Sequence, residues 1–230
     1  MLRKNNFIII VFILISIVFC KENEEPGFEK DFTKSYRPIK DKLPYYKSRN
    51  LDPYWSEKGD KPDDLRKLPS FKLISQTGDE VNNKKFLGKY SIVVFFYAKC
   101  GGICPMITRN MINFLPKIED KSDFDVISIT INPDNEDSKE MLKFRNNYKI
   151  KDENWYFLTG DKDTIYDLAR DQFGAEINLV RGKNDLNDFV HTENVFLLDK
   201  ENYLRGIYRA KGGGDLDRLL KDIEVIRKTN

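Results

Sequence analysis

The chain has 230 residues, of which 40% are hydrophobic and 33% charged, so it is long enough to bury the core of one domain. Its 39 basic and 37 acidic residues give a formal net charge of +2, and two of the basic residues, Arg3 and Lys4, stand at the extreme N-terminus. This near balance lacks the basic excess with which proteins bind nucleic acids, so we expect no nucleic-acid partner.

The N-terminus has the pattern of an export signal. After Arg3 and Lys4 comes a mostly apolar run over residues 7–19, shorter than the roughly 20 residues that span a bilayer. Cys20 ends the run and resembles the acylated cysteine of bacterial lipoproteins, although Phe19 stands where those signals usually have a small residue. We expect residues 1–20 to be a signal or lipoprotein anchor, with an ordinary signal or an uncleaved anchor as alternatives. Each would place the remainder on the extracytoplasmic (periplasmic) face of the cell envelope.

Residues 21–67 read as a tether. They are rich in charged residues and hold five of the nine prolines, with no sustained periodicity. The aromatic residues of the second half, Tyr45, Tyr46, Tyr54 and Trp55, predict that this half packs on the domain that follows.

Strand and helix signals alternate over residues 68–230, which we interpret as one domain. Continuous β-branched and aromatic runs at residues 91–98 and 124–131 are typical of strands buried on both faces. The remaining predicted strands cover residues 71–74, 155–158, 194–198 and 203–209, the last two forming a hairpin. The predicted helices cover residues 105–118, 134–148, 161–173 and 215–227.

This order predicts an α/β fold: a mostly parallel central sheet with flanking helices and a C-terminal antiparallel hairpin. Two cysteines lie in the loop after the first long strand, and the helix begins at the second of them. That layout is thioredoxin-like.

Cys100 and Cys104 are the chemically distinctive residues of the domain. Cys104 precedes Pro105 at the predicted start of a helix, where the helix dipole and free N–H groups favour a thiolate. A structural disulfide would close only a short loop and would add little stability. A functional pair is therefore favoured, acting either as metal ligands or as a redox couple.

His191 is the only histidine in the chain. It follows a polar loop over residues 182–188 and precedes the predicted strand 194–198, which should lie beside the strand that leads to the cysteines. Loops at that end of an open α/β sheet form ligand sites. Two thiolates and one imidazole suit Cu(I).

Two sequence features separate metal binding from redox chemistry. Three residues lie between the cysteines, whereas thioredoxin-type oxidoreductases generally have two. Those enzymes also place a proline opposite the cysteines, but no proline follows Pro133 in this chain, and His191 stands at the equivalent place. A thiol–disulfide oxidoreductase that uses only Cys100 and Cys104 nevertheless stays open. A thiol peroxidase is disfavoured because the Cys100 loop has no threonine. A purely structural lipoprotein is the remaining alternative.

Five blocks in order resemble the Sco/SenC copper chaperones, which help to assemble the binuclear copper site of cytochrome c oxidase. The blocks are residues 68–78, 93–105, 128–137, 155–160 and 191–199. The resemblance implies a thioredoxin fold with an inserted segment at roughly 174–190, and copper bound as Cu(I) or Cu(II) by Cys100, Cys104 and His191. It implies a metallochaperone rather than an enzyme, delivering copper to the copper-binding subunit of cytochrome c oxidase. Thiol–disulfide reductases or other copper chaperones would be further partners.

Two positions depart from the family pattern. Gly101-Gly102 replaces a frequent Pro-Asp pair, which should make the loop more mobile, and Val190 replaces the Asp that many members have before the histidine. Asp188 lies two residues before Val190.

Overall fold

The computed structural model describes residues 38–56, 59–175, 177–181, 187–191 and 193–229. The predicted signal segment with Cys20 and the first half of the predicted tether lie outside these residues. Among the helices of the described part, none has both the length and the apolar character needed to cross a bilayer.

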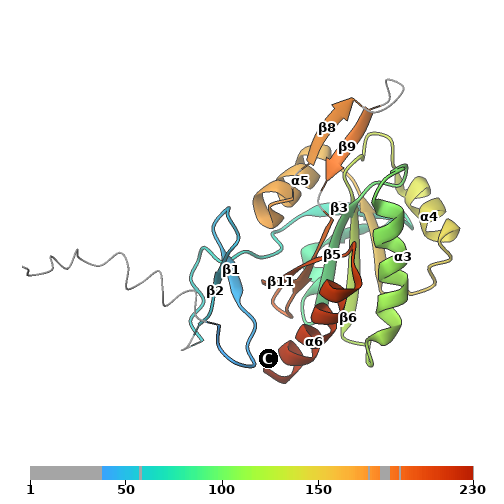
Figure 1. The fold of residues 1–230 in the computed structure, drawn as a ribbon. Coiled ribbons are helices and arrows are strands. Elements are labelled where there is room, and N and C mark those ends of the chain that lie inside the picture. Colours follow the sequence, from blue (N-terminus) through green and yellow to red (C-terminus); the bar gives the residue numbers. More distant parts are fainter. Residues whose placement is uncertain (1–37, 57–58, 176, 182–186, 192, 230) are drawn as a thin grey trace, which may run out of the picture. The chain divides into compact units, whose positions relative to one another are not determined.

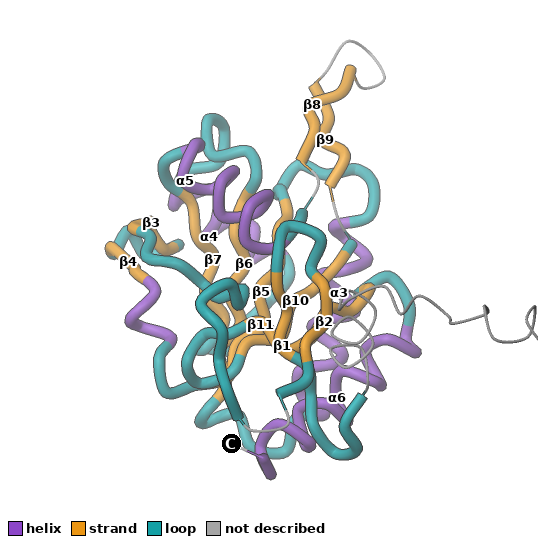
Figure 2. Tube along the Cα trace, turned by 90° about the vertical axis from the view of Figure 1, so that its left-hand side faces the viewer, coloured by secondary structure: helices purple, strands orange, loops and turns teal. Residues whose placement is uncertain are grey.

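A seven-stranded sheet forms the centre of the domain (Figure 1). Its strand order is β11-β10-β5-β6-β7-β3-β4 (Figure 2). Its strands are β3 (Lys72–Ser75), β4 (Glu80–Asn82), β5 (Tyr90–Phe96), β6 (Phe124–Thr130), β7 (Trp155–Thr159), β10 (Asn194–Leu198) and β11 (Leu204–Arg209). The three central strands β5, β6 and β7 are parallel, and antiparallel strands continue the sheet on both sides. The predicted α/β class, the C-terminal hairpin and the place of strand β10 beside β5 are confirmed.

All seven residues of β5 and of β6 are buried, which explains their unbroken apolar sequence. Successive side chains of β5 face opposite sides of the sheet. Phe95 packs on Phe173, whereas Phe96 packs on Phe144 and Phe157. Both faces of the central strand are therefore covered.

In the described part of the chain, four α-helices accompany the sheet: α3 (Cys104–Phe114), α4 (Ser138–Asn147), α5 (Lys162–Asp167) and α6 (Gly213–Thr229). Helices α3 and α4 cover the Phe96 side, and α5 lies across the sheet from them (Figure 1). Short helical turns extend three segments: η1 (Asn83–Phe86), η2 (Leu115–Lys117), and the π-helical η3 (Leu168–Gln172), which continues α5.

Two short antiparallel hairpins were not predicted. Strands β1 (Tyr45–Lys47) and β2 (Asp52–Tyr54) pair within the tether, and β8 (Ile177–Arg181) pairs with β9 (Asn187–His191). The β8–β9 hairpin stands outside the seven-stranded sheet (Figure 2). The region predicted as an inserted segment is therefore partly a hairpin, and His191 is its last strand residue.

Residues 39–56 and 59–67, here called the strap, run beside the edge of the sheet. The guanidinium of Arg205 on β11 donates to the backbone oxygens of Leu43 (2.9 Å) and Pro44 (3.0 Å). Arg66 in turn donates to the backbone oxygens of Ser48 and Asp171, both at 2.5 Å. The strap is thus fixed at two places, once through its own main chain and once through the side chain of Arg66.

Candidate functional site

The two cysteines lie where the loop after β5 turns into helix α3. β5 ends at Phe96, and α3 begins at Cys104 with Pro105 in its first turn, where a missing N–H costs nothing. Ile103 occupies the N-cap position and supplies no side-chain cap. The sequence prediction of a helix that begins at the second cysteine is confirmed.

The two cysteines occupy different environments. Cys104 is 1% exposed, whereas Cys100 is half-buried. The two side chains are hydrogen-bonded to each other, and the Cys100 sulfur also accepts from the N–H of Gly102 at 3.3 Å. The structure therefore brings the two predicted sulfur ligands together in the thiol form.

The pKa of Cys104 is raised, in contrast to the expectation from its place at a helix start. The hydrogen bond to Cys100 is the largest cause, followed by burial, and the negative charges of Cys100 and Glu136 add to it. A backbone hydrogen bond at Cys104 lowers the pKa but is the smallest contribution. The helix terminus is thus outweighed at this position by the partner thiol and by burial.

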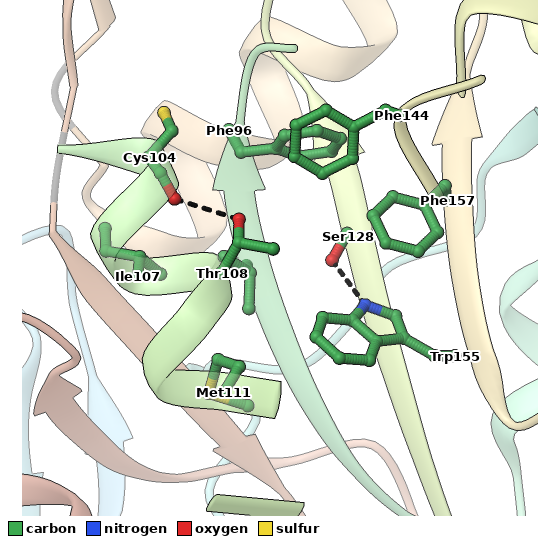
Figure 3. A pocket seen from close by; sticks show the side chains of 10 residues that line it. Phe96, Cys104, Ile107, Thr108, Met111, Ser128, Phe144, Trp155 and Phe157 are labelled. Atoms are coloured by element: carbon green, nitrogen blue, oxygen red, sulfur yellow. Dashed lines mark hydrogen bonds between the residues drawn. The ribbon is translucent and has the colours of Figure 1, made fainter. Parts of the chain in front are cut away.

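An apolar wall backs Cys104 on its inner side. Cys104 lines one edge of a small cavity together with Phe96, Phe144 and Phe157, and its backbone oxygen accepts from the Thr108 hydroxyl at 2.8 Å (Figure 3). The cavity is part of the packed core and is no substrate pocket.

Glu136 is a buried acidic residue that the sequence analysis did not select. It is fully buried, and its Oε1 accepts from the N–H groups of Ala98 (2.7 Å) and Lys99 (3.3 Å). Its Oε2 accepts from the hydroxyl of Thr130 at 2.5 Å. Burial raises the pKa of Glu136, and these hydrogen bonds oppose that shift. Its setting among Asp134, Asn135 and Asp137 gives no sign of burial in the sequence.

His191 is placed by its backbone alone. It pairs with Ile177 at the base of the β8–β9 hairpin and precedes β10 by three residues. Because β10 is antiparallel to β5, with Val195 opposite Val94, the start of β10 lies at the same end of the sheet as the cysteine loop. The side chain of His191, like those of Val190 and Asp188, lies outside the described part. Among the described side chains, no three His, Cys, Asp or Glu residues gather as a metal site.

The Gly101-Gly102 pair is not required by the backbone of the loop. A Cβ at Gly101 would meet no atom within 4 Å, and one at Gly102 would meet the Cys100 sulfur at an ordinary 3.7 Å. Neither glycine is among those with positive φ. The loop has room for side chains at both positions.

Comparison with known proteins identifies relatives over most of the domain. The SCO1/SenC family model matches residues 59–226. The SCO1 protein homolog of Bacillus subtilis is 25% identical over 156 residues, covering 67% of this chain and 79% of that protein. The SCO2-like protein RT0576 of Rickettsia typhi is 27% identical over 150 residues, covering 64% of this chain and 72% of that protein.

Solved structures share the fold. A SCO1/SenC family lipoprotein from Bacillus anthracis superposes with a TM-score of 0.64 at 21% identity, covering 70% of this chain and 95% of that chain. BsSco is described as a member of the Sco family of cytochrome c oxidase assembly proteins with a disulfide switch. It superposes with a TM-score of 0.62 at 23% identity, covering 72% of this chain and 95% of that chain. Bradyrhizobium japonicum ScoI with copper bound superposes with a TM-score of 0.59 at 19% identity, covering 69% of this chain and 98% of that chain.

These likenesses confirm the predicted thioredoxin-like arrangement. The family model spans the sheet, the cysteine loop, the β8–β9 hairpin and nearly all of helix α6. With its cysteine pair at the start of α3 and most of its described fold inside this match, the chain belongs to the SCO1/SenC family.

Proposed function

We propose that this protein is a membrane-tethered copper chaperone that carries one copper ion on Cys100, Cys104 and His191. The observation that supports this best is the contact between the side chains of Cys100 and Cys104 beyond the carboxyl end of β5. A relative of the same fold, Bradyrhizobium japonicum ScoI, has been solved with copper bound. Thiolates are soft ligands that suit Cu(I), and a neutral imidazole can complete three-coordination.

The proposed recipient is the copper-binding subunit of cytochrome c oxidase. BsSco, which shares the fold, belongs to a family described as cytochrome c oxidase assembly proteins. A three-coordinate ion leaves room for an incoming ligand, so copper can pass to the recipient by ligand exchange. Acylation of Cys20 would hold the domain at the outer surface of a membrane, where that exchange takes place.

Copper binding should strengthen as the pH rises. A thiol must lose its proton to bind a metal, and the pKa of Cys104 is raised, so this thiol is protonated at neutral pH. Each proton released on binding raises the apparent affinity about tenfold per pH unit. Below a pH of about 6, protonation of His191 adds a second loss. Cu(I) competition titrations from pH 5.5 to 8.5 measure this slope, and an affinity that does not change with pH would contradict thiolate ligation.

The ligand set is tested on the full chain, reduced and purified in detergent. Titration with Cu(I) against a chromophoric Cu(I) chelator should give one ion per chain. Cys104→Ser should abolish tight binding, and His191→Ala should weaken it while the two thiols still hold the ion. A stoichiometry well below one, or full affinity in His191→Ala, would refute the three-ligand proposal. The Cys20→Ser variant is the matched control, because Cys20 belongs to the proposed anchor.

The second candidate function is thiol–disulfide exchange on exported proteins. It is favoured by the unequal exposure of the pair, in which half-buried Cys100 can attack and buried Cys104 can resolve the mixed disulfide. A substrate disulfide would be reduced to two thiols while Cys100 and Cys104 form a disulfide. His191→Ala separates the two functions, since it should lower copper affinity and leave the rate of disulfide reduction unchanged.

A further inference from the structure

Glu136 joins the ends of the three parallel strands below the cysteine loop. It lies between β6 and α4, and its backbone oxygen accepts from the hydroxyl of Thr159, the last residue of β7, at 2.6 Å. Its carboxylate reaches the hydroxyl of Thr130, the last residue of β6, and the N–H groups that follow β5. All three contacts are made by a residue with no exposed surface.

The other backbone hydrogen bonds described within the loop are local to it. Its middle is Gly101-Gly102, and the N-cap residue Ile103 offers no side-chain cap. The N–H of Cys100 bonds to the backbone oxygen of Tyr97 at 3.3 Å, within the same loop. The carboxylate of Glu136 therefore connects the start of the loop to the neighbouring strand β6 through hydrogen bonds.

We propose that Glu136 is a positioning residue for the thiol pair. By holding the N–H groups of Ala98 and Lys99 against the ends of β6 and β7, its Oε1 sets where Cys100 stands relative to Cys104. The role depends on the acceptor atom and on the length of the side chain rather than on its negative charge. The inference rests on the proposed function as far as copper is concerned, whereas the thiol–disulfide equilibrium tests it without any metal.

Three substitutions separate length, charge and hydrogen bonding. Glu136→Gln keeps the length and an acceptor oxygen for the two N–H groups but removes the charge. Glu136→Asp keeps the charge but withdraws the oxygens by one carbon–carbon bond. Glu136→Ala removes both and leaves two backbone N–H groups without their acceptor, which is costly in a buried place.

The measurement is the equilibrium constant between the Cys100–Cys104 disulfide and the dithiol in defined redox buffers. It uses the full chain in detergent with Cys20→Ser as background. Glu136→Gln should remain within about twofold of the parent protein. Glu136→Ala should shift the equilibrium about tenfold toward the dithiol, or about 30 mV for a two-electron couple, because the thiols are no longer held together. Glu136→Asp should shift it in the same direction by a smaller amount.

Asp125 supplies the matched control. It is another buried carboxylate, 1% exposed, but it lies at the amino end of β6 and accepts a hydrogen bond from Lys89 at 3.1 Å. Asp125→Ala and Asp125→Asn should lower the resistance to urea, as Glu136→Ala should. They should leave the thiol equilibrium within about twofold of the parent, because they are remote from the loop.

Three results would overturn the inference. The first is a Glu136→Ala equilibrium equal to that of Glu136→Gln, and the second is an equal shift in Asp125→Ala, which would indicate general loosening. The third is a shift in Glu136→Gln but none in Glu136→Asp, which would assign the effect to charge; this comparison serves even if the Ala variant does not fold.

In Cu(I) titrations, Glu136→Ala should bind about tenfold more weakly than Glu136→Gln. Absence of binding by the parent protein would refute the copper proposal alone, since the redox comparison stands without it.

Discussion

Cys100 and Cys104 are separated by only four positions, yet the fold gives them different chemistry. Cys104 is backed by aromatic rings and is almost fully buried, while Cys100 remains partly accessible at the turn. The spacing of the two residues is visible in the sequence. The raised pKa of Cys104 is not, because it depends on the partner thiol and on burial that only the folded chain creates.

This difference predicts selective alkylation. With limiting iodoacetamide at pH 7.5, Cys100 should react at least about tenfold faster than Cys104, because a thiol with a raised pKa is protonated and each unit of pKa costs tenfold in thiolate. Fragment-ion mass spectrometry of the peptide that contains both residues measures the two rates. In 8 M urea the rates should converge, and equal rates in the native protein would show that the burial of Cys104 is wrong.

The burial of Glu136 could not be predicted from the sequence around it. It lies in a run of polar residues between a strand and a helix, and such runs are normally solvated. Its burial follows from the way β5, β6 and β7 end side by side, so it emerges only with the tertiary structure. The cysteines could be selected from the sequence because their residue type is rare, whereas acidic residues are common.

At the level of elements, helix α4 begins four residues later than predicted. The sequence prediction started at residue 134, but Asp137 has extended backbone angles and its Oδ1 accepts from the N–H groups of Lys139 and Glu140, both at 3.0 Å. This is the geometry of an N-cap. The three residues before it form a turn, in which the side chain of Glu136 points inward instead of continuing a helix.

Asp137→Ala should therefore lower the free energy of unfolding by about 1 kcal/mol. Asp137→Asn should lower it much less, because an amide oxygen can also serve as the cap. Urea denaturation followed by circular dichroism measures both variants. An equal loss in the two would show that the side-chain oxygen of Asp137 does not cap α4.

The elements that were predicted correctly carry strong, continuous signals, as β5 and β6 do. The hairpin of β8 and β9 was missed because its strands pair only with each other and flank a polar segment. The β1–β2 hairpin was missed for a similar reason, since its three-residue strands give no measurable alternation and one of them contains Pro53.

For the molecule as a whole, the strap links the predicted anchor to the domain, and Arg205 is the centre of that link. Arg205 is 5% exposed and pairs with Asp199, which is 2% exposed, at 3.0 Å. It also lies over the ring of Tyr45, at 4.0 Å from the ring centre. One buried guanidinium thus joins the C-terminal hairpin to the strap.

Arg205→Ala should lower the free energy of unfolding by about 3–5 kcal/mol, because it leaves the buried carboxylate of Asp199 without its partner. Arg49 is the control, since it forms an ion pair with Asp171 but its side chain is 81% exposed. Arg49→Ala should cost less than about 1 kcal/mol. Urea denaturation compares the two, and a similar small loss in both would contradict a central role for Arg205.

The contacts of Arg205 with the strap also determine which mutations the link can tolerate. Both acceptors, on Leu43 and Pro44, are carbonyl oxygens of the main chain, and every amino acid carries such an oxygen. The sequence of the strap can therefore drift without loss of these two bonds, whereas the donor has no substitute with the same fork of N–H groups. In related chains, the selective pressure that preserves these two bonds should fall on the position of Arg205 in β11 rather than on those of Leu43 and Pro44.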